Sequence, residues 1–313
     1  MREGPACSNV STSRLLSLLA CTLLLAVPAL AAANAAEKLG YPPGAKLLMI
    51  HADDLAVSHS VDRASFGALD RGDATSASIM VPCPWLTEVA AYAKEHPNAD
   101  LGLHLTLNSE WKTYRWGPLA KGVPGLLDPA GYFWPDTVSV VRSAKPEEVE
   151  AEIRAQVERA LKAGIRPTHL DSHMGTVMTP AFLAVYVKVA HAYGLPFLAF
   201  RSSAIEPLLQ EGDILPDAGA IMLPSVKPEN WTDFYLRVIR ELRPGLTVLI
   251  VHLGYDDAGL QAITGGAATD WGSAWRQRDL NVIGSPEFKQ CLRDNNITLI
   301  GWKQIQEHRL RKP

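Results

Sequence analysis

The sequence predicts an α/β protein whose core is a parallel β-sheet. Seven short apolar runs alternate with segments of helical periodicity between residues 46 and 300, and such alternation is typical of parallel strands joined by crossover helices. Polar residues follow several of these runs, as they do where the ends of strands form a site. The pattern leaves a barrel and an open sheet as alternatives. Because no repeat and no linker divides the chain, we expect a single domain.

Each predicted strand is a short apolar run bounded by polar or turn-forming residues. The first is followed at once by Asp53 and Asp54, the third carries His104 within Leu-Gly-Leu-His-Leu, and the sixth ends in His252. The full set of predicted strands is 46–51, 76–81, 101–107, 168–172, 197–200, 246–252 and 297–300.

The predicted helices lie between these runs. In the clearest one, 146–163, Pro146 suits the first helical position and Gly164 suits the stop. Val149, Ile153 and Val157 fall on one face of that helix. The other predicted helices are 60–71, 85–95, 180–193, 229–242 and 286–295.

The N-terminal segment resembles a secretory signal peptide. Arg14 precedes an apolar stretch at 15–33, and Ala33-Asn34-Ala35 forms a small-x-small cleavage site. We expect a signal peptide at 1–36, cleaved near Ala35 or Ala36, and a single domain at 37–313. The protein would then be periplasmic or secreted, without membrane contact after cleavage, although the apolar stretch is also long enough to remain as an anchor.

The composition excludes several partners and chemistries. With 30 Lys and Arg against 33 Asp and Glu, the net charge of −3 offers no basic surface for nucleic acid. Neither Cys83 nor Cys291 belongs to a Cys-x-x-Cys motif, so a thiolate zinc site has no support. The sequence leaves open whether these two cysteines pair.

Ionisable residues collect in and after the predicted strands. In parallel α/β folds the carboxyl ends of strands lie at one edge of the sheet, so residues far apart in the sequence converge there. We expect such convergence for Asp53, Asp54, His104, His169, Asp171, His173 and His252.

Each of these residues also has a purely structural interpretation. A strand-end aspartate such as Asp54 often caps the following helix, and a histidine flanked by leucines, such as His104, is often a hydrogen-bonded core residue. The segment 169–173 is the strongest signal, because two imidazoles and a carboxylate within five residues are costly to bury without a role.

Together these residue types suit metal-assisted hydrolysis. One carboxylate and two imidazoles can hold a divalent ion and leave open positions, as catalytic sites require. Asp54, His104 and His173 fit that task. Asp53 is then the candidate general base and a protonated His252 the candidate general acid for hydrolysis of an amide or ester.

Five ordered segments resemble the motifs of the YdjC-like, or ChbG/HpnK-type, carbohydrate deacetylases. They are HADDLAVSHSVDRA (51–64), GLHLTLN (102–108), RPTHLDSHMG (166–175), VHLGYDD (251–257) and RQRDLNVIGSPEFKQCLRDNNITLIGW (276–302). The resemblance implies a distorted (β/α) TIM-like barrel that removes acetyl groups from N-acetylated sugars with a divalent metal, such as Zn²⁺ or Mg²⁺. By motif position it places the metal ligands at Asp54, His104 and His173, the base at Asp53 and the late histidine at His252.

Other residues are candidates for supporting roles. Asp171 could accept the spare N–H of a metal-bound histidine, with His169 beside it. Arg201 is the candidate partner of Asp53, since the family places an arginine after the corresponding strand. The long insertion at 108–145 is rich in aromatic residues, and Trp111 and Trp116 would either contact a sugar or form a small core under the loop.

Two other functions remain open at this stage. Two histidines and one carboxylate also describe non-haem iron oxygenases. Departures from the family pattern, such as Leu55-Ala56 after the paired aspartates, keep open a non-catalytic glycan-binding protein on the same scaffold. The expected partner is an acetylated sugar or oligosaccharide, and a homodimer is the assembly considered.

Overall fold

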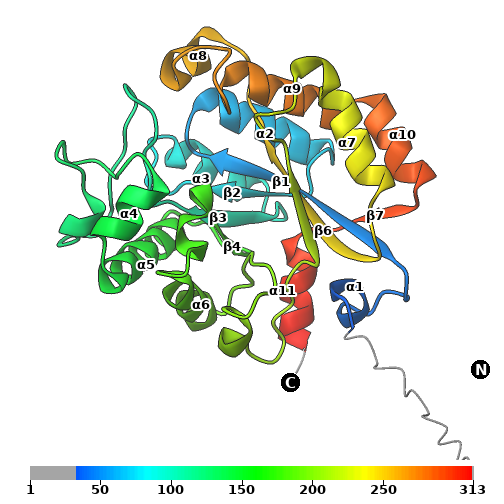
Figure 1. Ribbon diagram of the computed structural model, residues 1–313, viewed down its shortest axis with the longest axis horizontal. Helices are drawn as coiled ribbons and strands as arrows, with labels where there is room; N and C mark the ends of the chain where they lie inside the picture. The colour runs from blue at the N-terminus through cyan, green and yellow to red at the C-terminus, as the bar shows by residue number, and fades with distance from the viewer. Residues whose placement is uncertain (1–32, 312–313) are drawn as a thin grey trace, which may run out of the picture. The chain divides into compact units, whose positions relative to one another are not determined.

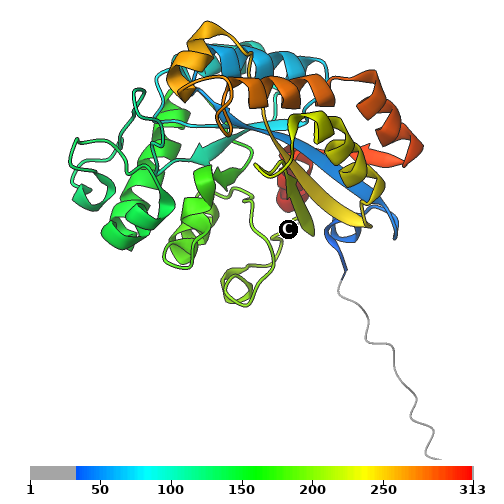
Figure 2. The same cartoon turned by 45° about the horizontal axis from the view of Figure 1, so that its top comes forward.

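A seven-stranded parallel sheet forms the centre of the computed structural model, which describes residues 33–311 (Figure 1). The strand order is β4-β3-β2-β1-β6-β5, and β7 pairs with the first part of β1. The sheet curls into a half-barrel with helices on its outer side (Figures 1 and 2). The strands are β1 Lys46–Leu55, β2 Ser76–Ile79, β3 Leu101–Leu105, β4 Leu170–Ser172, β5 Ala218–Ile221, β6 Gly245–His252 and β7 Ile297–Leu299. The α/β prediction and the distorted barrel implied by the resemblance are therefore confirmed.

The register of the sheet brings the ionisable residues together. Asp53 on β1 lies opposite His252 on β6, and His104 on β3 lies opposite Asp171 on β4. Both pairs lie at or near the carboxyl ends of their strands, where parallel α/β folds form their sites. The convergence expected from the sequence thus follows from pairing between strands far apart in the chain.

Helices pack outside the sheet through apolar faces. On α5, Val149, Ile153 and Val157 are fully buried, as the helical periodicity predicted. The α-helices are α1 Ala35–Lys38, α2 His59–Asp70, α3 Leu86–Glu95, α4 Thr137–Ser143, α5 Pro146–Lys162, α6 Leu183–Ala192, α7 Trp231–Arg240, α8 Ala258–Thr264, α9 Ser273–Ile283, α10 Pro286–Asp294 and α11 Trp302–Arg311. Four short 3₁₀-helices are η1 Pro124–Leu126, η2 His173–Met178, η3 Glu206–Leu208 and η4 Pro228–Asn230.

Some predicted elements differ from the structure. Residues 197–200 were expected to form a strand but make a single bridge, between Leu170 and Phe197. The sheet uses β5 instead, whose sequence Ala-Gly-Ala-Ile has low strand propensity and gave no signal. The helices α1, α4, α8, α9 and α11 were also missed. The predicted count of seven strands holds, but one of its members is different.

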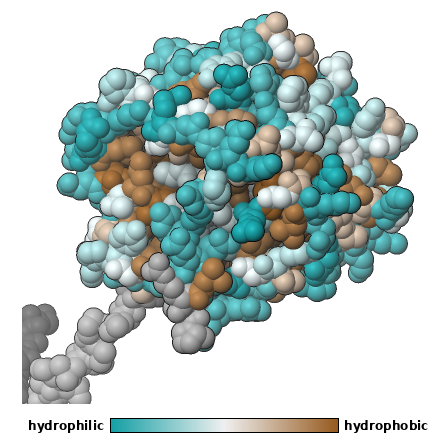
Figure 3. Space-filling model, turned by 180° about the vertical axis from the view of Figure 1, so that it is seen from behind, coloured by the Kyte–Doolittle hydropathy of each residue, from teal (hydrophilic) through white to brown (hydrophobic). Residues whose placement is uncertain are grey.

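The predicted signal peptide at 1–36 lies mostly outside the described residues. Where the description begins, Ala35 and Ala36 are buried in α1, and the Ala35 N–H donates to Asp217 Oδ2 at 3.0 Å. Among the described residues, no helix combines the length and apolar character needed to cross a bilayer. Cys83 and Cys291 are both buried and unpaired. The face in Figure 3 is mainly hydrophilic, with hydrophobic side chains gathered in separate patches.

Candidate active site

A cavity of about 410 Å³ lies at the carboxyl ends of the strands. Residues from β1, β3, β4, β5 and β6 line it, together with α9, η2 and the loops that follow β3 and precede α9. These residues are Asp53, Asp54, His104, Glu110, Trp111, Asp171, Ser172, His173, Met174, Gly175, Met178, Leu198, Ile221, Ile250, His252, Asp270, Trp271 and Arg276. Most of the residues that the sequence singled out therefore border one space.

Asp54, His104 and His173 form a group that could hold a metal ion. Asp54 Oδ1 lies 3.4 Å from His104 Nε2 and 3.4 Å from His173 Nδ1. Three ligand atoms, one from each residue, lie within 4.8 Å of one another. Ligands placed about 2.0–2.1 Å from a zinc ion at tetrahedral angles lie roughly 3.3 Å apart. Asp54 Oδ1 is buried and accepts no hydrogen bond, so its environment fits a cation.

The backbone around Asp54 explains how its carboxylate reaches the cavity. Asp54 and Ala56 have positive φ values of 73° and 74°, which are uncommon for residues with a side chain. The Asp62 carboxylate holds this turn by accepting a 2.6 Å hydrogen bond from the Ala56 N–H. A strained turn kept in place by a buried partner is typical of functional sites.

Arg276 on α9 fixes the other oxygen of Asp54. Its Nη2 donates to Asp54 Oδ2 at 2.7 Å, and its Nε donates to the Trp271 carbonyl at 2.8 Å. Burial favours the neutral acid, but the Arg276 charge and the nearby His104 and His173 imidazoles outweigh it and hold the pKa of Asp54 well below its ordinary value. Asp54 is therefore ionised, with Oδ1 left toward the histidines.

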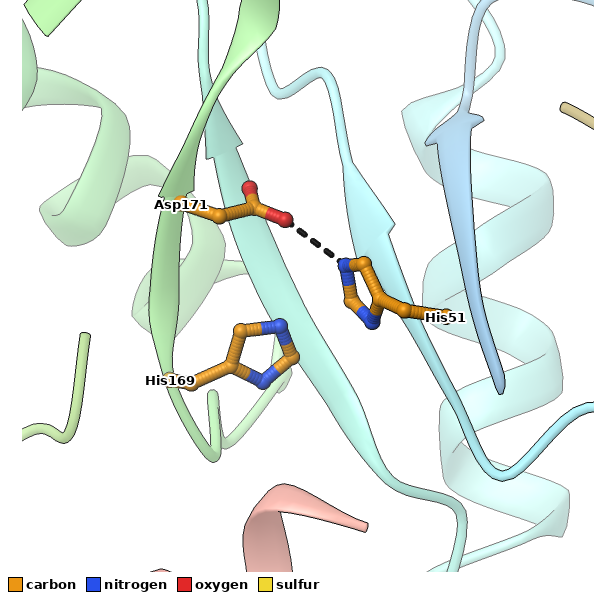
Figure 4. Close-up of side chains that lie close together, drawn as sticks. All are labelled: His51, His169 and Asp171. Carbon is orange, nitrogen blue, oxygen red and sulfur yellow. Dashed lines mark hydrogen bonds and ion pairs between the residues drawn. The ribbon is translucent and has the colours of Figure 1, made fainter. Parts of the chain in front are cut away.

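Asp171 accepts a hydrogen bond from His104 and so orients its ring. Its Oδ1 accepts a 2.8 Å hydrogen bond from His104 Nδ1, which turns Nε2 toward Asp54. Its Oδ2 accepts a 2.7 Å bond from His51 Nε2 (Figure 4). His51 in turn contacts Ser76 Oγ through Nδ1 at 2.7 Å. The sequence interpretation did not single out His51, although it opens the HADD motif.

His169 lies beneath this network and does not border the cavity. Its ring stacks on Trp302 with centroids 4.7 Å apart and meets the His51 ring edge-on at 4.9 Å. Figure 4 shows His51, His169 and Asp171 together, and their ligand atoms also lie within 4.8 Å. The 2.7 Å hydrogen bond between His51 and Asp171 already uses one ligand atom of each of these two side chains. The Asp54 group, which borders the cavity, is the better metal candidate.

Asp53 and His252 lie beside the candidate metal group. Asp53 Oδ2 is 3.7 Å from His104 Nε2 and 3.9 Å from His252 Nε2. Burial, with the nearby carboxylates of Asp171 and Asp54, raises the pKa of Asp53 to about 6 despite the opposing histidines. Burial lowers the pKa of His252 to about 3. His252 is therefore neutral near pH 7 and would act as an acid only after it has received a proton.

One predicted aromatic residue lines the cavity, and polar residues in and next to its walls were missed. Trp111 lines the cavity, whereas Trp116 is buried, donates from Nε1 to the Asn108 carbonyl at 2.7 Å and packs 6.5 Å from the His173 ring. The sequence interpretation missed Glu110, whose Oε2 lies 3.1 Å from His173 Nε2. It also missed Asp279, which accepts the His252 N–H at 3.0 Å.

The prediction for Arg201 is wrong. Arg201 is exposed and its Nη1 donates to Glu206 Oε1 at 2.7 Å, so it does not reach Asp53. The buried cation of the site is Arg276, bonded to Asp54. Arg276 opens the last of the five motif segments, and that was the available signal for it.

Comparison with known proteins places this architecture in a family. The profile described as YdjC-like protein matches residues 47–294, which includes every strand except β7 and the start of β1. The chain belongs to the YdjC-like family. The recognition made from the five sequence motifs is thereby confirmed.

Relatives of this YdjC-like protein cover nearly its whole fold. A carbohydrate deacetylase of Thermus thermophilus is 34% identical over 283 residues, which is 87% of this chain and 97% of the relative. A carbohydrate deacetylase of Enterococcus faecalis is 33% identical over 268 residues, which is 83% of this chain and 98% of the relative. The crystal structure of a candidate cellobiose-phosphate cleavage protein from Enterococcus faecalis superposes with a TM-score of 0.70 and 26% identity, covering 83% of this chain and 99% of that one.

Proposed function

We propose that this YdjC-like protein is a carbohydrate deacetylase that hydrolyses the acetamido group of an N-acetylated sugar with a divalent metal ion. The observation that carries the proposal is the pairing of a buried Asp-His-His group with a second carboxylate, Asp53, in one cavity. The relatives named carbohydrate deacetylases, which match over almost their full length, support it independently.

Asp54, His104 and His173 would hold the ion. A bound divalent ion supplies a Lewis acid for the amide carbonyl and lowers the pKa of a water molecule. Asp171 and Glu110 accept hydrogen bonds from the outer nitrogens of the two histidines, and such bonds fix ring orientation and make the ligating nitrogen more basic. The donor set of one oxygen and two nitrogens suits zinc better than magnesium.

Asp53 and His252 handle the protons of the reaction. Asp53 accepts a proton from the attacking water as the oxygen–carbon bond forms. His252, neutral at rest and 3.9 Å from Asp53, can receive this proton and pass it to the sugar nitrogen as the carbon–nitrogen bond breaks. The products are acetic acid, which releases its remaining proton to solvent as acetate, and a free amine, so the transfer from Asp53 to nitrogen returns both side chains to their starting states.

Two indole rings are available for the sugar itself. Trp111 lies on the His173 side of the cavity and Trp271 lies on the His252 side. The centroids of the Trp271 and His252 rings are 6.5 Å apart. Aromatic faces suit the weakly apolar C–H surfaces of a sugar ring. We therefore expect a sugar to lie between these indoles with its acetamido group at Asp54.

Acetate release from N,N′-diacetylchitobiose tests the function. We expect activity that is lost in EDTA and restored by Zn²⁺ or another divalent ion. Asp53→Asn should keep metal content but lower kcat about 10²–10⁴-fold, whereas Asp233→Asn, an exposed carboxylate on α7, should change neither. Binding of the sugar without acetate release would favour the glycan-binding alternative. A strict requirement for Fe(II) and oxygen would favour the oxygenase.

A further inference from the structure

The charges that line the cavity are mostly negative. Its wall contains five carboxylates, which are Asp53, Asp54, Glu110, Asp171 and Asp270. Among the described residues that line it, there is no lysine, and Arg276 is the arginine. A divalent ion on the Asp54 group would still leave fewer positive charges than carboxylates.

Arg276 offers no free charge to a substrate. Its guanidinium is 1% exposed and bonds to the ionised Asp54 carboxylate at 2.7 Å. Arg115 and Arg201 do not line the cavity, and each is paired with a carboxylate of its own, Asp128 and Glu206. A phosphate or carboxylate group on a sugar would thus enter without a free lysine or arginine side chain to balance it.

Two of the acidic residues accompany the indole walls. Glu110 directly precedes Trp111 and is partly exposed, while Asp270 directly precedes Trp271 and is exposed. Among the residues that the structure describes, Asp270 forms no hydrogen bond and no ion pair, so no neighbour neutralises its charge. The deeper wall is apolar and consists of Met178, Leu198, Ile221 and Ile250.

From this arrangement we infer that the cavity selects an uncharged acetylated sugar and rejects the same sugar bearing a phosphate or carboxylate group. The inference rests on the proposed function, because it concerns the substrate of the same site. Like charges placed together at a binding surface exclude wrong partners. The uncharged sugar meets indoles, aliphatic side chains and hydrogen-bonding groups there, and brings no charge that the carboxylates would repel.

The test compares N,N′-diacetylchitobiose with its 6-phosphate at low salt. We expect kcat/KM for acetate release to be at least about tenfold higher for the uncharged sugar. The preference should shrink at high ionic strength, since salt screens exposed charges. Equal or better use of the phosphorylated sugar would overturn the inference.

Asp270 provides the decisive variant because it is exposed and bonds to none of the candidate ligands. Asp270→Lys should reduce the preference at least about threefold, and the matched reversal Asp233→Lys on α7 should leave it unchanged. Calorimetric binding of both sugars to the Asp53→Asn protein separates this inference from the proposed function. If the wild-type protein hydrolyses neither sugar but the Asp53→Asn protein binds only the uncharged one, the proposed function fails and the charge selection stands. Equal binding of the two sugars to the Asp53→Asn protein would refute the charge selection.

Discussion

His51 illustrates how one buried side chain can act on the site without touching it. It is 1% exposed and lies between Ser76 Oγ and Asp171 Oδ2, each 2.7 Å away. Asp171 in turn orients His104. Such outer partners of a metal-binding histidine fix its tautomer and raise its affinity for the ion. We therefore regard His51 as a positioning residue for the candidate metal group.

Replacing His51 with alanine should weaken zinc binding about 10- to 100-fold, because Asp171 loses one of its two histidine donors. Calorimetric titration of the apoprotein with ZnCl₂ measures the change. His59→Ala is the control, since His59 is half exposed, pairs with Glu88 and does not line the cavity. Unchanged zinc affinity in a His51→Ala protein that melts like the wild type would contradict the positioning role.

Asp62 gives a pH-dependent prediction at a single residue. Burial, with the neighbouring Glu88 carboxylate, raises its pKa from 3.8 to about 9 against the bond from the Ala56 N–H. Between pH 3.8 and about pH 9, Asp62 is protonated in the folded protein and ionised in the unfolded chain. The contribution of Asp62 to the free energy of unfolding therefore falls as pH rises from about 4 to about 9.

Asp62→Asn keeps an acceptor for the Ala56 N–H and removes the titration. We expect it to raise the free energy of unfolding by about 2 kcal/mol or more at pH 8, and by less at pH 5. Urea unfolding at both pH values provides the measurement, with Asp233→Asn as the exposed control. An equal effect of Asp62→Asn at the two pH values would show that Asp62 is not protonated in the folded protein.

At the scale of elements, strands with strong apolar runs were predictable and the sheet edge was not. β1 and β6 are long, apolar runs that pair over eight residues, from Lys46 to Asp53. β5 is a four-residue edge strand of three small residues and one isoleucine, so neither propensity nor periodicity marks it. The residues 197–200 have a strand-like composition but make one bridge, because tertiary packing overrides propensity in short segments.

The same distinction applies to the site. The convergence of Asp53, Asp54, His104, His173 and His252 could be predicted because the carboxyl ends of parallel strands meet at one edge of the sheet. Arg276 could not be paired with Asp54 from the sequence, since it lies on a helix that was itself missed. Glu110 likewise reaches His173 only through the fold of the insertion after β3.

Gly102 on β3 tests how tightly the floor of the barrel is packed. A methyl group at this position would collide with the ring of His169. Gly102→Ala should therefore lower the free energy of unfolding by about 1–3 kcal/mol, the usual effect of overpacking a core. Urea denaturation measures this change in the free energy of unfolding.

Gly117 provides the control. An added methyl group there would meet its nearest atom at 3.4 Å, so Gly117→Ala should change the free energy of unfolding by less than about 0.5 kcal/mol. Equal effects at the two glycines would show that His169 can move aside.

At the scale of the whole molecule, the candidate metal group links elements that are distant in the chain. Asp54 belongs to β1, His104 to β3 and His173 to the start of η2, and Arg276 joins α9 to the same carboxylate. An unfolded chain does not bring these residues together. An ion that binds the folded state and not the unfolded chain must then stabilise the entire fold by mass action.

Zinc at 100 times its dissociation constant should raise the free energy of unfolding by about 2.7 kcal/mol, which corresponds to an increase in Tm of about 5 °C for a domain of this size. Thermal unfolding of the apoprotein with ZnCl₂ and with EDTA measures this shift. His104→Gln and His173→Gln should each abolish most of it, whereas Asp53→Asn should retain it, because Asp53 lies outside the ligand group. A shift that persists in both histidine variants would place the ion elsewhere, and the hydrolytic role of the cavity would then lose its physical basis.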